Sequence, residues 1–156
     1  VPGVYAVGDV NGGPQFTYVS LDDFRIVFGT LTGNGQYTLK DRKNIPYTTF
    51  LTPPLSRVGL TEEDAINQGY TVKTKEMLVA TMPRAHVNDY LKGAFKIVVD
   101  ADNDLILGAT LYSQGAEELI NLIKMAMDNN IPYTYFKNQI FTHPTMAENL
   151  NDLCNF

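Results

Sequence analysis

The sequence is poor in cysteine and histidine and has no tryptophan. Its 156 residues contain one cysteine, Cys154, and two histidines, His86 and His143. A single cysteine excludes an intrachain disulfide framework and is typical of proteins of the reducing cytoplasm, so we expect a cytoplasmic protein. The two histidines lack both the spacing of metal ligands and any third candidate ligand, so we predict no metal site. We expect His86, in a polar connection, to be exposed.

Long apolar runs, basic clusters and nucleotide-binding glycine motifs are also missing. No stretch approaches the roughly 20 apolar residues that cross a bilayer. The net charge is −5 and no basic patch is present, so we expect neither a membrane nor a nucleic acid as partner. There is no Gly-x-Gly-x-x-Gly motif, which excludes the usual phosphate-binding turns for FAD and NAD(P)H within these residues. A Cys-x4-Cys redox pair is absent as well.

The most informative stretch that is present runs from Phe141 to Leu150. His143 is held by a following proline, and Glu148 comes five residues later. Thr145 and Glu148 have the spacing of a capping box, which predicts a helix that begins after Thr145. The carboxylate can then reach the imidazole, fix its tautomer and leave the other ring nitrogen free as an acid or base. Alternatively, the pair is only a helix cap and His-Pro only a loop corner.

The first part of the chain predicts a strand, a helix and a linker. The apolar run that ends in Gly8-Asp9 predicts a buried strand with Asp9 at its carboxyl end. A break at Gly12-Gly13-Pro14 precedes a predicted helix over Thr17–Leu31, whose wide apolar surface suits burial against a larger body. We expect the acidic pair Asp22-Asp23 to lie on the solvated face of this helix. Polar, turn-rich residues then indicate a linker.

The remaining residues predict one α+β unit. Helices are expected from Thr61 to Gly69 and from Ala116 to Asp128. Extended segments are expected at 50–52, 57–60 and 71–82. Phe95, Ile97 and Val99 alternate as a half-buried strand, and a turn at 102–104 leads to a return strand at 105–111, which predicts a hairpin. The helix at 116–128 has a wide apolar band. This band is either an ordinary core face or a contact with a dimer partner.

Two motifs together resemble the C-terminal part of the flavoprotein disulfide reductases, the pyridine nucleotide-disulfide oxidoreductases. These motifs are Val1-Pro2-Gly3-Val4-Tyr5-Ala6-Val7-Gly8-Asp9 and His143-Pro144-Thr145-x-x-Glu148, about 130 residues apart. Pro53, the run Arg57-Val58-Gly59-Leu60-Thr61-Glu62-Glu63 and the run Leu107-Gly108-Ala109 also look like landmarks of the family.

Further segments resemble a bacterial branch of this family that is associated with resistance to reactive chlorine and with reduction of copper ions. They are Gln15-Phe16-Thr17-Tyr18, Leu21-Asp22-Asp23, Asp41-Arg42-Lys43-Asn44, Thr52-Pro53-Pro54-Leu55-Ser56-Arg57-Val58-Gly59 and Asn151-Asp152-Leu153.

The resemblance implies a fold and a domain organisation. It implies an α+β fold in which an antiparallel sheet has helices packed on one side, preceded by a strand-helix remnant of an FAD-binding domain. We expect the remnant at 1–31, a linker at 32–46 and the dimerisation domain at 47–156. Because the nucleotide-binding turns and the redox cysteines are missing, we expect a fragment of a longer, FAD- and NAD(P)H-dependent oxidoreductase, inactive by itself and binding no cofactor.

The resemblance also implies roles for individual residues. The family aspartate that matches Asp9 binds the ribityl chain of FAD, and the segment that matches Gln15, Phe16 and Thr17 lies near the flavin pyrimidine. The family histidine that matches His143 is the acid-base partner of the redox thiol of the other subunit in a homodimer, and the glutamate that matches Glu148 orients it. The rival reading is a dimerising or binding module without redox chemistry. We expect Cys154, which lacks the paired tail cysteines of mercuric reductases, to be packed without such a role.

Overall fold

The computed structural model describes all 156 residues. The chain forms two compact units, Val1–Lys43 and Asn44–Phe156. The first unit consists of the short 3-10 helix η1 (Gly8–Asn11) and the helix α1 (Thr17–Thr32). The helix α1 therefore ends one residue later than predicted. Gly33 stops it because this residue adopts a left-handed φ of 75° that is costly for other residues.

The predicted strand before Asp9 is wrong for this chain. The residues ahead of Gly8 form a turn, in which the Val4 amide donates to the Val1 carbonyl, followed by irregular backbone. A strand exists only where a neighbour takes its backbone hydrogen bonds, and none of the five strands in the structure pairs with this segment. Asp9 is carried instead by η1, which contains no buried residue.

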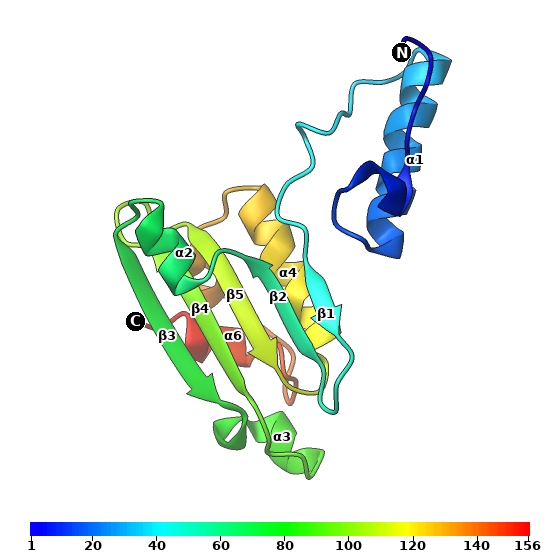
Figure 1. Cartoon of the computed structure of the whole chain (residues 1–156). Helices are drawn as coiled ribbons and strands as arrows, with labels where there is room; N and C mark the ends of the chain where they lie inside the picture. The colour runs from blue at the N-terminus through cyan, green and yellow to red at the C-terminus, as the bar shows by residue number, and fades with distance from the viewer. The chain divides into compact units, whose positions relative to one another are not determined.

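The second unit is built on a five-stranded antiparallel sheet with the order β1-β2-β5-β4-β3 (Figure 1). The strands are β1 (Tyr47–Thr49), β2 (Leu55–Gly59), β3 (Val72–Leu78), β4 (Ala94–Asp100) and β5 (Ile106–Tyr112). The expected extended piece at 50–52 is not a strand. The strand expected over 71–82 ends at Leu78, since the chain then turns into the 3-10 helix η2 (Val79–Thr81), which points Val79 into the core.

The predicted hairpin of β4 and β5 is confirmed. Phe95 pairs with Leu111 and Ile97 with Ala109, and the chain turns through Asp102–Asp104. These four paired side chains point to one face of the sheet and are buried there. Alternation along β4 therefore identified the core face correctly.

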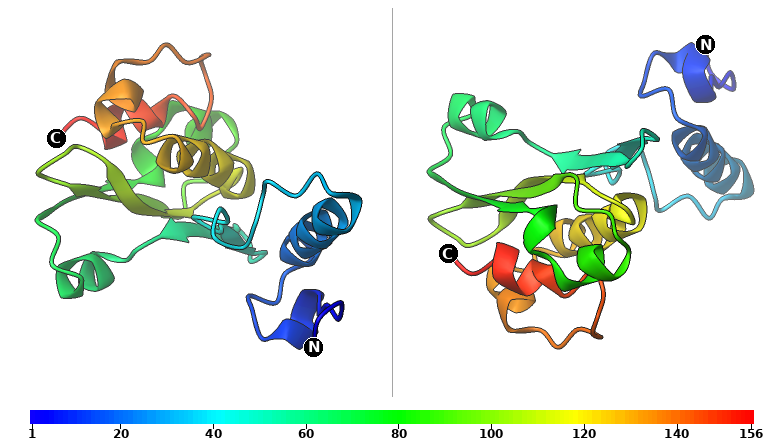
Figure 2. Two further views of the ribbon diagram at one scale, coloured as in Figure 1. Left: turned by 90° about the horizontal axis from the view of Figure 1, so that it is seen from above. Right: turned by 90° about the horizontal axis from the view of Figure 1, so that it is seen from below.

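Two helices cover the core face of the sheet, α4 (Ala116–Asp128) and α6 (Asn149–Leu153), and α5 (Tyr133–Asn138) packs against α6 (Figure 2). The bounds of α4 are those predicted. The short α2 (Glu62–Asn67) lies over the opposite face, and α3 (Pro83–Val87) lies at one end of the sheet. The fold is α+β, with an open antiparallel sheet and its main helices on one side, as expected. No helix combines the length and apolar character that crossing a membrane requires.

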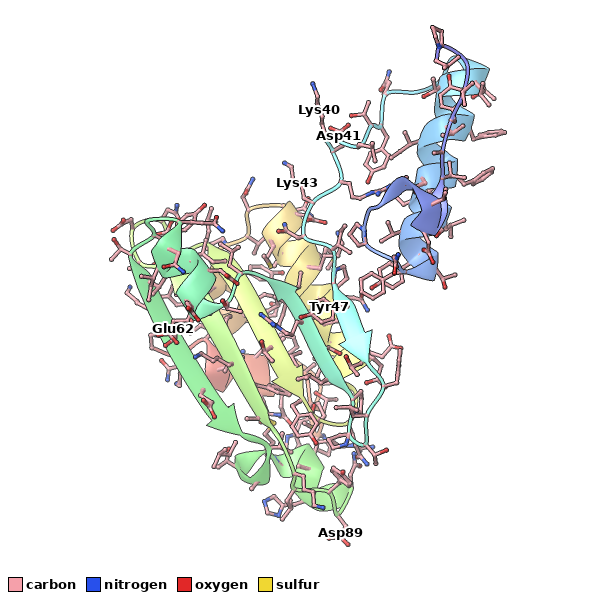
Figure 3. The ribbon with its side chains drawn as sticks, in the orientation of Figure 1. Lys40, Asp41, Lys43, Tyr47, Glu62 and Asp89 are labelled. Atoms are coloured by element: carbon pink, nitrogen blue, oxygen red, sulfur yellow. The ribbon has the colours of Figure 1, made fainter.

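A capping box begins α2, and an exposed ion pair connects this helix to the sheet. The Thr61 hydroxyl accepts from the amide of Asp64, whose carboxylate accepts from the Thr61 amide. Glu62, at the start of this helix (labelled in Figure 3), places its Oε2 2.6 Å from the Nζ of Lys96 of β4. Both ends of this bridge are 40% exposed, so it contributes little to stability.

The core of the second unit reaches the C-terminal helix. Phe95, Ile97, Leu111, Ile123 and Leu150 are completely buried. Removing an aliphatic side chain of this kind from water contributes about 1.5–3 kcal/mol. Because Leu150 belongs to α6, the segment that carries His143 is attached directly to the core.

Candidate functional site

His143 and Glu148 contact each other at the turn that precedes α6. The His143 Nδ1 lies 2.7 Å from Glu148 Oε2. The other carboxylate oxygen, Oε1, accepts from the Thr145 amide at 3.0 Å, and the Thr145 hydroxyl accepts from the Glu148 amide at 3.2 Å. The reciprocal bonds of a capping box are thus present.

The predicted helix start after Thr145 is wrong, however. The α-helix α6 begins at Asn149, and residues 146–149 form a tighter turn in which the Asn149 amide bonds the Met146 carbonyl. Glu148 uses both carboxylate oxygens on this turn, one for His143 and one for the Thr145 amide. The box therefore orders the turn that carries His143.

Two asparagines hold the segment on both sides of His143. Asn149, which is buried, donates to the carbonyls of Thr145 and Met146. Asn151 donates to the carbonyls of Phe136 and Gln139 at 2.6 and 2.9 Å. These bonds satisfy carbonyls at the end of α5 and in the following loop, so the chain enters the His143 turn in a fixed path.

The electrostatics of the pair leave one imidazole nitrogen available. The hydrogen bond from His143 lowers the pKa of Glu148, and the Thr145 amide lowers it further, although partial burial opposes them. An ionised Glu148 can only accept, so Nδ1 carries a proton and Nε2 of a neutral ring is the unprotonated nitrogen. The His143 side chain is 68% exposed. Its free nitrogen can therefore exchange a proton with a group outside this chain.

The other histidine has no such arrangement. His86 lies in α3 and is exposed, as expected, and its Nε2 contacts the Ala80 carbonyl at 2.8 Å. No group of three or more histidine, cysteine, aspartate or glutamate side chains is placed to hold a metal ion.

Cys154 is buried at the end of α6, where its thiol stays protonated. Burial raises the pKa of its thiol to about 12, although the charge of Lys75 opposes this slightly. Lys75 Nζ itself donates to the carbonyls of Asp152 and Asn155. A buried thiol with this pKa is mostly protonated at neutral pH, which disfavours a role as a nucleophile.

The residues expected near a flavin all lie in the first unit. Asp9 is exposed, and no hydrogen bond ties its carboxylate to the rest of the chain. Gln15 and Thr17 are exposed at the start of α1, and Phe16 is half-buried and stacks on Tyr18 with ring centroids 5.2 Å apart. No side chain caps the N-terminus of α1. The carboxylate of Asp9 is thus available to a ligand from outside this chain.

The sequence prediction missed a buried polar cluster in this unit. Asp23 was expected on a solvated face, but it is only 4% exposed. It accepts from the Gly8 amide and the Asn11 side chain and pairs with Arg42. Because Arg42 is 19 residues away in the chain, no local pattern could reveal this contact. The contacts of Asn151 were equally invisible.

Comparisons with known proteins place these observations in a family. A family model described as "Pyridine nucleotide-disulphide oxidoreductase, dimerisation domain" matches residues 45–154. The chain is 50% identical over 150 residues to the probable pyridine nucleotide-disulfide oxidoreductase RclA of Escherichia coli (strain K12), covering 96% of the chain and 34% of that protein. It is 35% identical over 147 residues to a mercuric reductase of Staphylococcus aureus, covering 94% of the chain and 27% of that protein.

A solved structure shows the same similarity in three dimensions. The HOCl-induced flavoprotein disulfide reductase RclA from Escherichia coli superposes with a TM-score of 0.93 at 50% identity, over 96% of this chain and 34% of that one. The chain thus spans about a third, or less, of the length of the relatives it matches.

Proposed function

The chain belongs to the pyridine nucleotide-disulphide oxidoreductase family, of which residues 45–154 form the dimerisation domain, and we propose that in the whole protein this domain supplies His143 and Glu148 to the redox-cysteine site of a second, identical subunit. In this proposal His143 is the acid-base residue and Glu148 orients its ring. The whole protein is a cytoplasmic FAD- and NAD(P)H-dependent oxidoreductase. The 156 residues alone do not turn over.

The observation that carries the proposal is the contact of 2.7 Å between His143 Nδ1 and Glu148. It orients an exposed imidazole whose second nitrogen is directed to no group of this chain. A nearby imidazolium stabilises a thiolate and can return a proton to a leaving thiol during disulfide exchange. Since Cys154 is the single cysteine and is buried, the thiols that His143 serves belong to residues outside this chain.

The first unit fits a role as one wall of a flavin site. The unengaged carboxylate of Asp9 can accept hydrogen bonds from ribityl hydroxyls. In the proposal, the residues at the start of α1, namely Gln15, Phe16 and Thr17, lie near the flavin pyrimidine, where the positive end of the helix dipole favours an electron-rich carbonyl. When bound, FAD would carry the electron pair between NAD(P)H and the cysteine pair; the residues of this chain would bind and orient it.

The exposed apolar surface of α1 supports a larger body beside it. Five large side chains along this helix are 45–68% exposed: Tyr18, Leu21, Phe24, Phe28 and Leu31. A monomeric protein seldom leaves such a contiguous stripe in water. In the proposal this surface is covered by the remainder of an FAD-binding domain.

Replacement of His143 by alanine in the full-length protein tests the proposal. We expect bound flavin to be retained, because His143 lies in the dimerisation domain, and thiol-dependent turnover to fall by about 10²- to 10⁴-fold through loss of the acid-base group. Oxidation of NADH or NADPH with a small disulfide as acceptor measures the effect across the pH range in which histidine titrates.

His86→Ala is the matched control, since it removes the other exposed histidine of the same domain. Equal turnover of wild type and His143→Ala at every pH would favour the rival function, a dimerising module without chemistry. A full-length protein without flavin would contradict the proposal at a different point, namely the oxidoreductase itself.

A further inference from the structure

Asp23 lies at the centre of the first unit, between three segments of the chain. Its Oδ2 accepts from the Gly8 amide at 2.7 Å and from Asn11 Nδ2 at 2.7 Å. Its Oδ1 pairs with Arg42 Nη2. Both oxygens of one carboxylate therefore join η1, α1 and the segment that leads into the second unit.

The turn η1 has little else to hold it in place. It contains no buried residue, no side chain caps it, and Val10 is 82% exposed. Hydrophobic packing therefore contributes almost nothing to its position. Both bonds to Asp23 come from the two ends of this turn, Gly8 and Asn11, and Asp9 lies between them. Fixing the two ends fixes the backbone of Asp9.

The charge of Asp23 is compensated where it lies. The Asp23 side chain is 4% and the Arg42 side chain 12% exposed, and Arg42 Nε also bonds Asp22 Oδ2 at 2.7 Å. The hydrogen bond from Arg42, together with those from Gly8 and Asn11, lowers the pKa of Asp23 against the opposing effect of burial. An ionised carboxylate accepts at both oxygens. Asp23 can therefore hold Arg42 and η1 at the same time.

We propose that Asp23 is a positioning residue for the flavin: it holds the η1 turn so that the Asp9 carboxylate meets the ribityl chain, and it ties this turn through Arg42 to the segment directly before the dimerisation domain. The inference rests on the proposed flavin-binding role of Asp9. Arg42 follows the turn at Lys40 and Asp41 (Figure 3), where Asp41 accepts from the Thr38 amide and hydroxyl.

An asparagine at position 23 cannot replace the aspartate in this geometry. An amide has one acceptor oxygen and one donor nitrogen. If its oxygen faces Gly8 and Asn11, its NH₂ group faces the guanidinium of Arg42, donor against donor. If it is turned around, the NH₂ group faces the Gly8 and Asn11 donors. Either orientation breaks one of the two links that the aspartate makes.

Asp22→Asn is the matched control for Asp23→Asn in the full-length protein. Asp22 bonds Arg42 and accepts from the Tyr37 hydroxyl, whereas the hydrogen bonds from η1 go to Asp23, and Arg42 keeps its pair with Asp23 in this variant. Both variants remove one negative charge from the same turn of α1. A general loss of negative charge from this part of α1 would therefore affect both variants, whereas loss of the link to η1 would affect only Asp23→Asn.

The measurement is the rate at which FAD leaves the purified protein, followed by flavin fluorescence, together with the visible circular dichroism of the bound flavin. For Asp23→Asn we expect release about tenfold faster, the size that loss of a charged hydrogen bond produces, and an altered dichroism spectrum. For Asp22→Asn we expect both to match wild type. Equal release from the three proteins, or equal acceleration in both variants, overturns the inference.

Asn11→Ala keeps the test decisive if Asp23→Asn does not fold. Asn11 is exposed, and its loss frees one acceptor site on Asp23 without removing the buried charge. We expect FAD release to accelerate, by less than in Asp23→Asn; an unchanged rate overturns the inference. Asp9→Ala separates the two proposals. If it leaves FAD binding unaltered, the role of Asp9 is wrong; if it weakens binding while Asp23→Asn and Asn11→Ala do not, only the positioning role is wrong.

Discussion

At the residue scale, the chemistry of the second unit depends on how Glu148 divides its two oxygens. One oxygen accepts from the imidazole of His143 and the other from the Thr145 amide. The hydrogen bond from the Thr145 amide fixes the carboxylate of Glu148, and the fixed carboxylate orients the imidazole ring of His143. Orientation of this kind removes rotational freedom that a free, exposed histidine would keep.

Glu148→Gln separates the charge of this side chain from its shape. The amide oxygen can still accept from Nδ1, but the charge-assisted bond is lost. In the full-length protein we expect thiol-dependent turnover to fall by about 10- to 100-fold, as for other residues that orient a functional histidine, with flavin content unchanged. Stopped-flow kinetics of disulfide reduction measures the change, and a wild-type rate would contradict the orienting role.

The same variant has a pH signature in stability. The hydrogen bond from His143 lowers the pKa of Glu148 in the folded state, so its stabilising effect is present above the ordinary glutamate pKa of about 4.3. The effect is lost as pH falls through the lowered folded-state pKa. The difference in unfolding free energy between wild type and Glu148→Gln, from urea titrations, should therefore shrink as pH falls below about 4.3. A difference that grows as pH falls below about 4.3 would have the wrong sign.

At the scale of elements, α2 shows how local sequence alone fixes a helix end. The capping box of Thr61 and Asp64 satisfies two amides that no helical carbonyl can reach. The three acidic residues that follow Thr61 also favour the positive end of the helix dipole.

Thr61→Ala tests the contribution of this cap. We expect a loss of about 1 kcal/mol in the free energy of unfolding, since the Asp64 amide loses its acceptor. Urea unfolding followed by far-ultraviolet circular dichroism measures it. Thr61→Ser, which retains a hydroxyl, is the control and should stay near wild type; an equal loss in both variants would point to packing of the threonine methyl group.

The helix α4 shows what such patterns leave open. Ile120, Ile123 and Ala126 are buried against the sheet, while Met125 is 56% exposed. The apolar band is therefore wider than the sheet needs. The sequence left two interpretations of this band open, a wide core face and a dimer contact. The buried residues fit a core face, and the exposed Met125 is available for a dimer contact.

At the scale of the whole molecule, this exposed side of α4 gives the proposed homodimer a testable surface. Met125→Glu places a charge on it, and we expect the full-length protein to shift from dimer toward monomer, because burying an unpaired charge at an interface is costly. Analytical ultracentrifugation measures the shift. Ile66→Glu on α2 is the control, since Ile66 is similarly exposed, at 54%, on the other side of the sheet. Identical sedimentation of both variants would exclude α4 from the interface.

The sequence by itself determined the elements whose information is local. The bounds of α4, the alternation in β4, the turn at Asp102–Asp104 and the cap of α2 follow from periodicity and short-range hydrogen bonds. The spacing of His143 and Glu148 likewise predicted their contact, because the capping-box turn between them brings two side chains five residues apart together.

Only the tertiary structure decided what depends on distant partners. The run before Asp9 has the composition of a strand, yet it is not one here, since no neighbouring strand takes its hydrogen bonds. The sequence predicted that Asp23 faces solvent, whereas in the folded chain it is buried and paired with Arg42. The reason is the same in both cases: a backbone amide or a buried charge is stable only with its partner, and partners far along the chain leave no mark in the local pattern.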